Sequence, residues 1–332
     1  MVGTLLGFAS GCSDDPGSKA AGGSGGASAG ASAAGTSSGG SSSGGSGGGA
    51  IAGSTSGGSG VVSAVPCTGT YGAAMPALQE AMNISINGIS LTADELEVYY
   101  ARNDAAVPGA QPQIVRRTRS AKTQPFGDFE VLAALDGVCP ADHLRVNPDI
   151  SEDGLSLYVT CTRAIDDPLA SEGVSPLRVA RRDERSAPFV LAPEQVGGVF
   201  ASAGISADEL TAYTDGEVFD TAPQLFTRAS KAEMFVGPQP VPGISTPYRS
   251  PDISSDGLAL FGATRNMATG TTAIYRALRP SKDSAFAAPV ALELGLPVMS
   301  AVGAPNITAS CALYFVAVLP NMPNMIHVAY QP

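Results

Sequence analysis

The clearest pattern in the chain is a phrase of apolar and polar residues that recurs along residues 90–320. It reads NPDISEDGLSLYVTCTR at 147–163 and SPDISSDGLALFGATRN at 250–266. Weaker copies are SLTADELEVYYARND (90–104), GISADELTAYTDGEV (204–218) and NITASCALYFVAVLP (306–320). A near-regular period of this length indicates stacked supersecondary units. The key apolar positions, spaced 59, 55, 48 and 54 residues apart, are Leu91, Ile150, Ile205, Ile253 and Ile307.

Each copy predicts four short strands. The first leads into a tight turn, Asp153–Gly154 or Asp256–Gly257, where Gly tolerates positive φ. The second strand is rich in aromatic and β-branched residues. Third strands are expected at 112–119, 176–183, 223–230, 272–279 and 324–331. Fourth strands, each beginning with an aromatic residue, are expected at 129–135, 189–196 and 286–292, with a poor, Pro-broken version at 235–241. Four antiparallel strands repeated radially form the blade of a β-propeller.

The two ends of the repeat region complement each other. The fifth copy stops after its third strand at Pro332, and YGAAMPAL (71–78) has the form of the missing fourth strand. We therefore expect an all-β domain over 67–332. It is a five-bladed β-propeller of four-stranded antiparallel blades, closed by an N-terminal strand, with six blades as the alternative.

The pattern P-D-I-S-x-D-G-x-x-L-[YF] resembles the repeat of TolB-like propellers, which are common in bacterial envelope proteins. It is sharp in two copies and degenerate in three, and it covers residues 70–332. TolB itself has six blades and an additional domain, and neither is visible in this sequence. The resemblance implies a propeller fold, an envelope location and an envelope protein as the leading partner.

The N-terminal region differs in composition from the repeats. Residues 13–66 are mostly Gly, Ser, Ala and Thr, with too little apolar surface to fold, so they predict a disordered tether. Residues 1–12 resemble the end of a bacterial lipoprotein signal, although the basic n-region is missing and the apolar stretch is short. Either the signal is incomplete and its true start lies upstream, or Cys12 is an ordinary thiol. The resemblance implies acylation of Cys12, and Ser13 favours the outer over the inner membrane. We expect a lipid-anchored envelope protein, periplasmic or surface-exposed.

Four cysteines remain once Cys12 is set aside. An envelope compartment permits disulfides, and four cysteines allow three connectivities. In a blade, the loop into the first strand and the loop after the second lie on the same face. This rule pairs Cys139 with Cys161, and Cys67 with Cys311 across the ring closure. Four buried free thiols are the alternative.

The net charge and the histidine content limit the kinds of partner and cofactor that we expect. The net charge is −11, and no basic cluster occurs, which argues against nucleic acid. The folded part has no run of 18 apolar residues that could span a membrane. His143 and His327 have no neighbouring ligand at metal spacing, so we expect no metal and no cofactor. The expected state is a monomer.

Acidic residues are the one set of candidate catalytic groups in this sequence. Asp149 and Asp252 occupy equivalent repeat positions, expected where the innermost strands begin, near the central channel. Five-bladed glycosidases place acidic residues around that axis, and two suitably spaced carboxylates suffice for glycoside hydrolysis. The same Asp satisfies backbone amides in many non-catalytic propellers. The equivalent positions in the other blades are Ser90, Gly204 and Asn306.

A second set of equivalent residues follows the second strands. Arg102, Arg163 and Arg265 are expected on one face together with Asp149 and Asp252, either as inter-blade ion pairs or as a polar binding surface. We expect a non-catalytic scaffold, assign no catalytic residue, and expect this face to bind an envelope protein or a cell-wall or surface glycan. The alternative is a carbohydrate-active hydrolase with carboxylates at the central channel. A third possibility is a structural remnant without a ligand.

Overall fold

The computed structural model describes residues 66–107, 111–139, 143–163, 175–193, 196–199, 202–215, 221–265, 272–297, 301–319 and 322–332. The signal-like segment with Cys12, and the tether apart from Pro66, lie outside these residues and remain predictions. Within the described part of the chain, no helix has the length and apolar content needed to cross a membrane.

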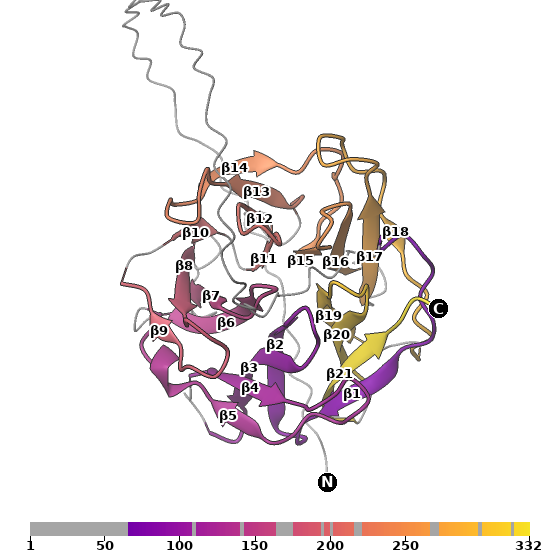
Figure 1. Ribbon diagram of the computed structural model, residues 1–332. Helices are drawn as coiled ribbons and strands as arrows, with labels where there is room; N and C mark the ends of the chain where they lie inside the picture. Colours follow the sequence, from indigo (N-terminus) through magenta and orange to yellow (C-terminus); the bar gives the residue numbers. More distant parts are fainter. Residues whose placement is uncertain are drawn as a thin grey trace, which may run out of the picture. The chain divides into compact units, whose positions relative to one another are not determined.

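The described residues form five antiparallel sheets arranged around a central axis, which confirms the expected five-bladed propeller (Figure 1). Blade 1 contains β2 (Ile84–Leu91), β3 (Glu97–Asp104), β4 (Gln113–Thr118) and β5 (Phe129–Val131). Blade 2 contains β6 (His143–Ile150), β7 (Ser156–Arg163), β8 (Ser175–Arg181), β9 (Val190–Leu191) and β10 (Gly197–Val199). A single 3-10 turn, η1 (Ala133–Leu135), connects these two blades.

The other three blades repeat the order. Blade 3 contains β11 (Ala203–Ile205), β12 (Thr211–Thr214), β13 (Gln224–Thr227) and β14 (Val236–Pro240). Blade 4 contains β15 (Arg249–Ile253), β16 (Ala259–Arg265), β17 (Thr272–Leu278) and β18 (Val290–Ala291). Blade 5 contains β19 (Ala301–Ile307), β20 (Leu313–Val318), β21 (Asn324–Ala329) and β1 (Met75–Gln79).

The outer strands of blades 2 and 3 contain or adjoin proline residues. In the expected strand over 189–196, Val190–Leu191 pairs with β8 as β9, and a second short strand, β10, pairs with β8 just beyond this range, after Pro193. The Pro-broken segment 235–241 nevertheless pairs with β13 as β14. Proline lacks the amide donor of a central strand, but an outer edge strand does not need it.

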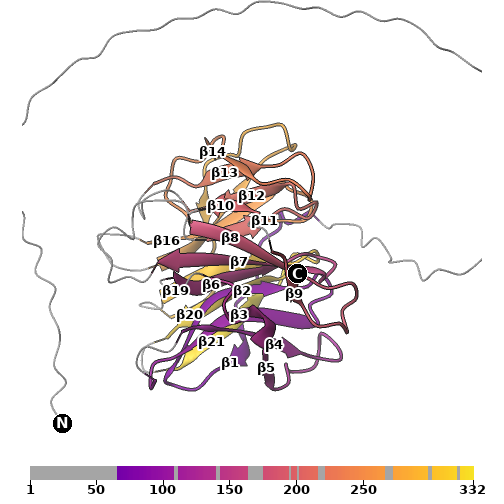
Figure 2. The same cartoon turned by 90° about the vertical axis from the view of Figure 1, so that its left-hand side faces the viewer.

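The ring is closed by the N-terminal strand. β1 pairs antiparallel with β21, from Met75 opposite Val328 to Gln79 opposite Met325, so indigo and yellow strands lie side by side (Figures 1 and 2). The disulfide Cys67–Cys311 joins residues 244 positions apart at this closure. Cys139–Cys161 joins residues 22 positions apart in blade 2. These are the two pairs that the sequence predicted.

The repeated phrase forms the hairpin turn between the first and second strands. In blade 4, the Asp256 carboxylate accepts hydrogen bonds from the Ser254 hydroxyl and the Leu258 amide, at 2.6 and 2.9 Å. The residue after this Asp has positive φ, which Gly adopts without strain. The residues at this turn position are Glu95, Gly154, Glu209, Gly257 and Cys311, with φ from +59° to +78°.

In blades 1 to 4, an arginine directly after the third strand holds this turn, a repeat that was not recognised in the sequence. The arginine Nε donates to the carbonyl oxygen of the positive-φ residue at 2.7 Å, and the guanidinium lies 4.4–4.6 Å from the ring of a phenylalanine seven residues later. The four pairs are Arg119–Phe126, Arg182–Phe189, Arg228–Phe235 and Arg279–Phe286.

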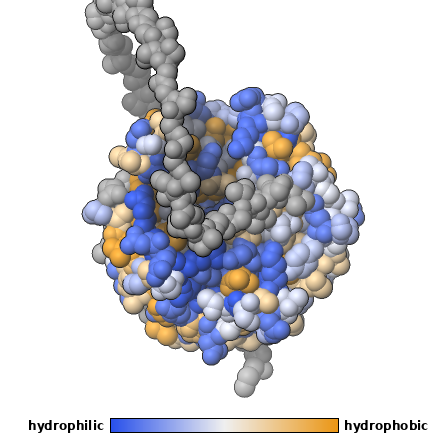
Figure 3. Space-filling view, viewed as in Figure 1, coloured by the Kyte–Doolittle hydropathy of each residue, from blue (hydrophilic) through white to orange (hydrophobic). Residues whose placement is uncertain are grey.

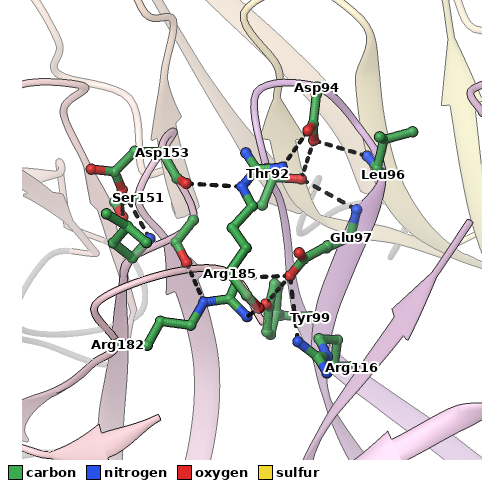
Figure 4. A network of polar contacts seen from close by, with 12 residues as sticks. Thr92, Asp94, Leu96, Glu97, Tyr99, Arg116, Ser151, Asp153, Arg182 and Arg185 are labelled. Atoms are coloured by element: carbon green, nitrogen blue, oxygen red, sulfur yellow. Dashed lines mark hydrogen bonds and ion pairs between the residues drawn. The ribbon is translucent and has the colours of Figure 1, made fainter. Parts of the chain in front are cut away.

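The same arginines connect blades 1 to 4 to the blade that precedes each of them in the ring. In Figure 4, Arg182 of blade 2 donates to the Glu97 carboxylate of blade 1 at 2.8 Å, and Arg185 forms an ion pair with Asp94. Arg228 and Arg279 reach tyrosine hydroxyls of the preceding blades in the same way. Apolar side chains fill the remaining space between neighbouring sheets, for example Tyr99, Ile114 and Leu135 against Leu157, Val159 and Phe189.

Candidate functional site

Five equivalent residues of the inner strands meet at the axis, each next to the last residue of its strand. In four of the five blades, the side chain of this residue accepts a hydrogen bond from a backbone amide of the neighbouring blade. The bonds are Ile150 N to Ser90 Oγ (3.0 Å), Ile205 N to Asp149 Oδ2 (2.6 Å), Ile307 N to Asp252 Oδ2 (2.6 Å) and Leu91 N to Asn306 Oδ1 (3.0 Å).

The fifth position of this ring is Gly204, which has no side chain to offer. A Cβ atom there would lie 2.3 Å from the Pro251 carbonyl oxygen, so the close approach of blades 3 and 4 requires Gly. The Ile253 amide instead donates to the carboxylate of the preceding residue, Asp252, at 3.0 Å. The ring of hydrogen bonds is therefore interrupted between blades 3 and 4.

Asp215 bridges this gap from a different position, directly after β12. Its Oδ1 accepts hydrogen bonds from the Ser202 hydroxyl at 2.5 Å and from the Ser250 amide of blade 4 at 2.6 Å. Asp215 lies within the copy at 204–218, but the equivalent positions of the other four copies are Ala or Thr, so no repeat of the acidic residue pointed to it. Its one sequence signal is that blade 3 has Gly where the other repeats have a polar residue.

The inner strands also share a bulge that the sequence did not reveal. Two residues before the axial position, the chain has positive φ at Gly88, Asn147, Ser250 and Ala304, between +46° and +61°. The register with the second strand shifts at the same point in these four blades. Bulges aim side chains in new directions and are common next to active sites.

The axial residues and bulges surround a hollow of about 20 Å³, which is large enough for one water molecule. Its lining includes both Asp149 and Asp252, together with Asn306, Ser202 and Ser250. The structure therefore brings together the two carboxylates that the sequence singled out. Ser202 and Ser250 also connect this hollow to Asp215.

Burial disfavours the ionised form of the three carboxyl groups at the axis. Asp149, Asp215 and Asp252 are 8%, 7% and 7% exposed. Burial raises the pKa of Asp149 to about 7 and that of Asp215 to about 6, although hydrogen bonds to both carboxylates act in the opposite direction. Burial also raises the pKa of Asp252 well above its ordinary value, and the charge of Asp149 raises it further. The axis thus holds carboxyl groups that exchange protons near neutral pH.

The expected common face for the aspartates and arginines is wrong for blade 2. Asp149 is the seventh of the eight residues of β6, so it lies at the end of the inner strand and not at its beginning. Arg163 pairs with His143 at the other end of β6. At roughly 3.3 Å per residue, the two positions are about 20 Å apart. The side chains of Arg163 and Arg265 lie outside the described residues.

Arg102 does not reach the hollow. Its Nε lies 3.5 Å from Oε2 of Glu80, which directly follows β1, and its guanidinium lies 4.7 Å from the Phe129 ring. Arg102 of blade 1 therefore forms an ion pair with blade 5, which was one of the two roles expected for it. His327 is buried and stacks on Phe315. Across the described ranges, no group of three His, Cys, Asp or Glu residues could hold a metal ion.

No family model and no curated protein matches this sequence. Among solved structures, a family GH43_1 enzyme from Xanthomonas citri complexed with xylose matches with a TM-score of 0.52 and 16% identity, covering 77% of this chain and 88% of that one. A family 117 glycoside hydrolase from Zobellia galactanivorans matches with a TM-score of 0.50 and 11% identity, covering 79% and 90%. A TolB from Acinetobacter baumannii matches with a TM-score of 0.39 and 11% identity, covering 74% and 55%. Identities this low show a shared fold.

These matches correct the main functional expectation, a non-catalytic scaffold without enzymatic activity. Both glycoside hydrolases named above match with a TM-score of at least 0.50, which favours the alternative reading. The repeated Asp does accept hydrogen bonds from backbone amides, as expected for a structural role. Its burial, which the sequence does not reveal, also gives the same carboxyl groups a raised pKa.

Proposed function

We propose that the propeller is a glycoside hydrolase whose reaction takes place at the central axis. The observation that carries the proposal is the pair Asp149 and Asp252, two buried carboxyl groups of raised pKa that line one hollow. The fold that the chain shares with solved glycoside hydrolases supports the same conclusion. A glycan therefore replaces an envelope protein as the leading partner.

The two carboxyl groups suit the two roles that glycoside hydrolysis needs, a proton donor and a base. Because the charge of Asp149 raises the pKa of Asp252, the pair loses its first proton mainly from Asp149. Asp252 then donates a proton to the glycosidic oxygen as the bond to the anomeric carbon breaks. Asp149 accepts a proton from a water molecule in the hollow, and the oxygen of that water bonds to the anomeric carbon.

The test is hydrolysis of a panel of aryl glycosides by the full chain and two variants. We expect Asp149→Asn and Asp252→Asn each to lower kcat/KM by at least about 100-fold, the usual effect of losing a general acid or base. Asp256→Asn is the matched control, because Asp256 holds the turn of the same blade as Asp252. No hydrolysis of any glycoside by the unmodified chain, or activity within twofold in both axial variants, would refute the proposal.

We also propose that the protein is lipid-anchored in the cell envelope through Cys12, with residues 13–66 as the tether. The signal-like residues 1–12 and the TolB-like repeat support this location. Two disulfides fit an oxidising compartment. Metabolic labelling with an alkyne fatty acid in a bacterial host tests it. Labelling should occur in the unmodified chain and Ser13→Ala and disappear in Cys12→Ala; equal labelling of Cys12→Ala contradicts the anchor.

A further inference from the structure

Blade 1 contains a second and larger cavity, of about 510 Å³, which shares no lining residue with the axial hollow. Its size lies within the range of about 300–1,000 Å³ that is usual for small-molecule sites. It lies where the end of β3, the start of β4 and the turn after η1 meet. The polar side chains that line it are Arg102, Asp104, Gln111, Gln113 and Asp136.

The Arg102 guanidinium supplies hydrogen-bond donors on one side of the cavity, and its position is fixed. The ring of Phe129, 4.7 Å away, and the Glu80 carboxylate, 3.5 Å from Nε, hold Arg102 in place. Its Nε is buried, so the terminal nitrogen atoms of the guanidinium are the donors that can contact a ligand in the cavity. A planar group with several N–H donors in a fixed orientation can bind two neighbouring oxygen atoms of one ligand.

The Asp104 carboxylate, which supplies hydrogen-bond acceptors to the cavity, is also held in place. Oδ1 of Asp104 accepts hydrogen bonds from Asn83 Nδ2 at 2.5 Å and from the Ala106 amide at 2.9 Å. These bonds orient the carboxylate at the end of β3 before any ligand arrives. Gln111 and Gln113 are exposed and add amide groups, each with a donor and an acceptor. Donors, acceptors and mixed groups therefore line one concave surface.

The charge of this lining selects against acidic ligands. It has two carboxylates, Asp104 and Asp136, against one guanidinium, and Glu80 already pairs with that guanidinium. A neutral ligand with many hydroxyl groups satisfies such a surface, because each hydroxyl both donates and accepts. We propose that this cavity is an accessory binding site for a neutral oligosaccharide. The choice of a carbohydrate as the ligand rests on the proposed glycoside hydrolase function.

Isothermal titration calorimetry tests the cavity with xylotriose, cellotriose and maltotriose as neutral probes and trigalacturonate as an acidic one. The binding variant is Gln111→Ala/Gln113→Ala. The control is Gln224→Ala, since Gln224 begins the third strand of blade 3 as Gln113 begins that of blade 1. We expect at least one neutral trisaccharide to bind, about 10-fold weaker in the double variant and within twofold in the control. Thermal unfolding should give both variants the Tm of the unmodified chain.

Three outcomes refute the inference: no neutral probe binds, the double variant binds within twofold of the unmodified chain, or trigalacturonate binds this cavity as tightly as the neutral probes. Titrations repeated in the Asp149→Asn background keep the two proposals distinguishable. If no glycoside is hydrolysed but the double variant loses binding, the proposed function fails and the binding site stands. If Asp149→Asn abolishes hydrolysis but the double variant binds normally, the proposed function stands and the binding site fails.

Discussion

The axial aspartates combine two tasks in one side chain. Asp149 accepts a backbone amide from blade 3 and a hydroxyl from blade 1, which fastens three blades together. These contacts bury Asp149 between the blades, and burial raises the pKa of its carboxyl group to about 7. The residue type could be predicted from the repeat, but the partners could not. Ser90 and Ile205 lie 59 and 56 residues away along the chain, so only the closed ring brings them to Asp149.

The raised pKa predicts how stability changes with pH. Between the unfolded pKa of about 3.9 and the folded pKa of about 7, folded Asp149 binds more protons than the unfolded chain, so stability is full below this window and falls as pH rises through it. Asp215 acts with the same sign, and buried His327, whose pKa is lowered, acts with the opposite one. We expect the Tm of Asp149→Asn, relative to that of the unmodified chain, to be higher at pH 8 than at pH 5, because only the unmodified chain loses stability over this range through ionisation of Asp149. A Tm difference that is the same at both pH values contradicts this assignment.

At the scale of elements, the hairpin turns followed from the sequence, whereas the contacts that hold them did not. The Ser-x-Asp-Gly phrase is local, and its hydrogen bonds span two to five residues. The arginine and phenylalanine that support the turn both come from the segment after the third strand. Their constant spacing of seven residues, as in Arg182–Phe189, was readable in four blades. The inner-strand bulges had no shared residue type to reveal them, since Asn147, Ser250 and Ala304 differ.

Removing one of these arginines should weaken a whole junction between blades. Arg182 donates to the Gly154 carbonyl and to Glu97 of blade 1, and its side chain is buried. Breaking such a buried pair typically costs about 3–5 kcal/mol. We expect Arg182→Ala to lower the free energy of unfolding, measured with urea, by about 3 kcal/mol. The control is Phe129→Ala, which removes a half-exposed outer-strand ring; a loss in Arg182→Ala no larger than in this control argues against the junction.

At the scale of the whole molecule, closure depends on contacts between the two ends of the propeller. β1 pairs with β21, and Cys67 is bonded to Cys311. This closure was predictable because its signals are simple: an unpaired strand pattern at 71–78 and four cysteines for which blade geometry selects one pairing. The raised pKa of the axial carboxyl groups, on which the proposed activity rests, was not predictable, because it depends on burial in the closed ring.

The two disulfides should differ in how much they stabilise the ring. A cross-link restricts the unfolded chain more when it closes a longer loop, and the separations are 244 and 22 residues. The chain-entropy relation gives a difference of about 2 kcal/mol. We expect Cys67→Ala/Cys311→Ala to lower the free energy of unfolding by that much more than Cys139→Ala/Cys161→Ala. Equal losses in urea unfolding contradict the closing role.

The central claim is that two axial carboxyl groups perform glycoside hydrolysis, and its most direct test is the pH profile of kcat/KM. Asp149 must be ionised and Asp252 protonated, so activity should rise with pH near 7 and fall again at higher pH. The rising limb should disappear in Asp149→Asn together with most of the activity. A profile that is flat from pH 5 to 9, or one that the Asp149→Asn variant shares, would contradict the account.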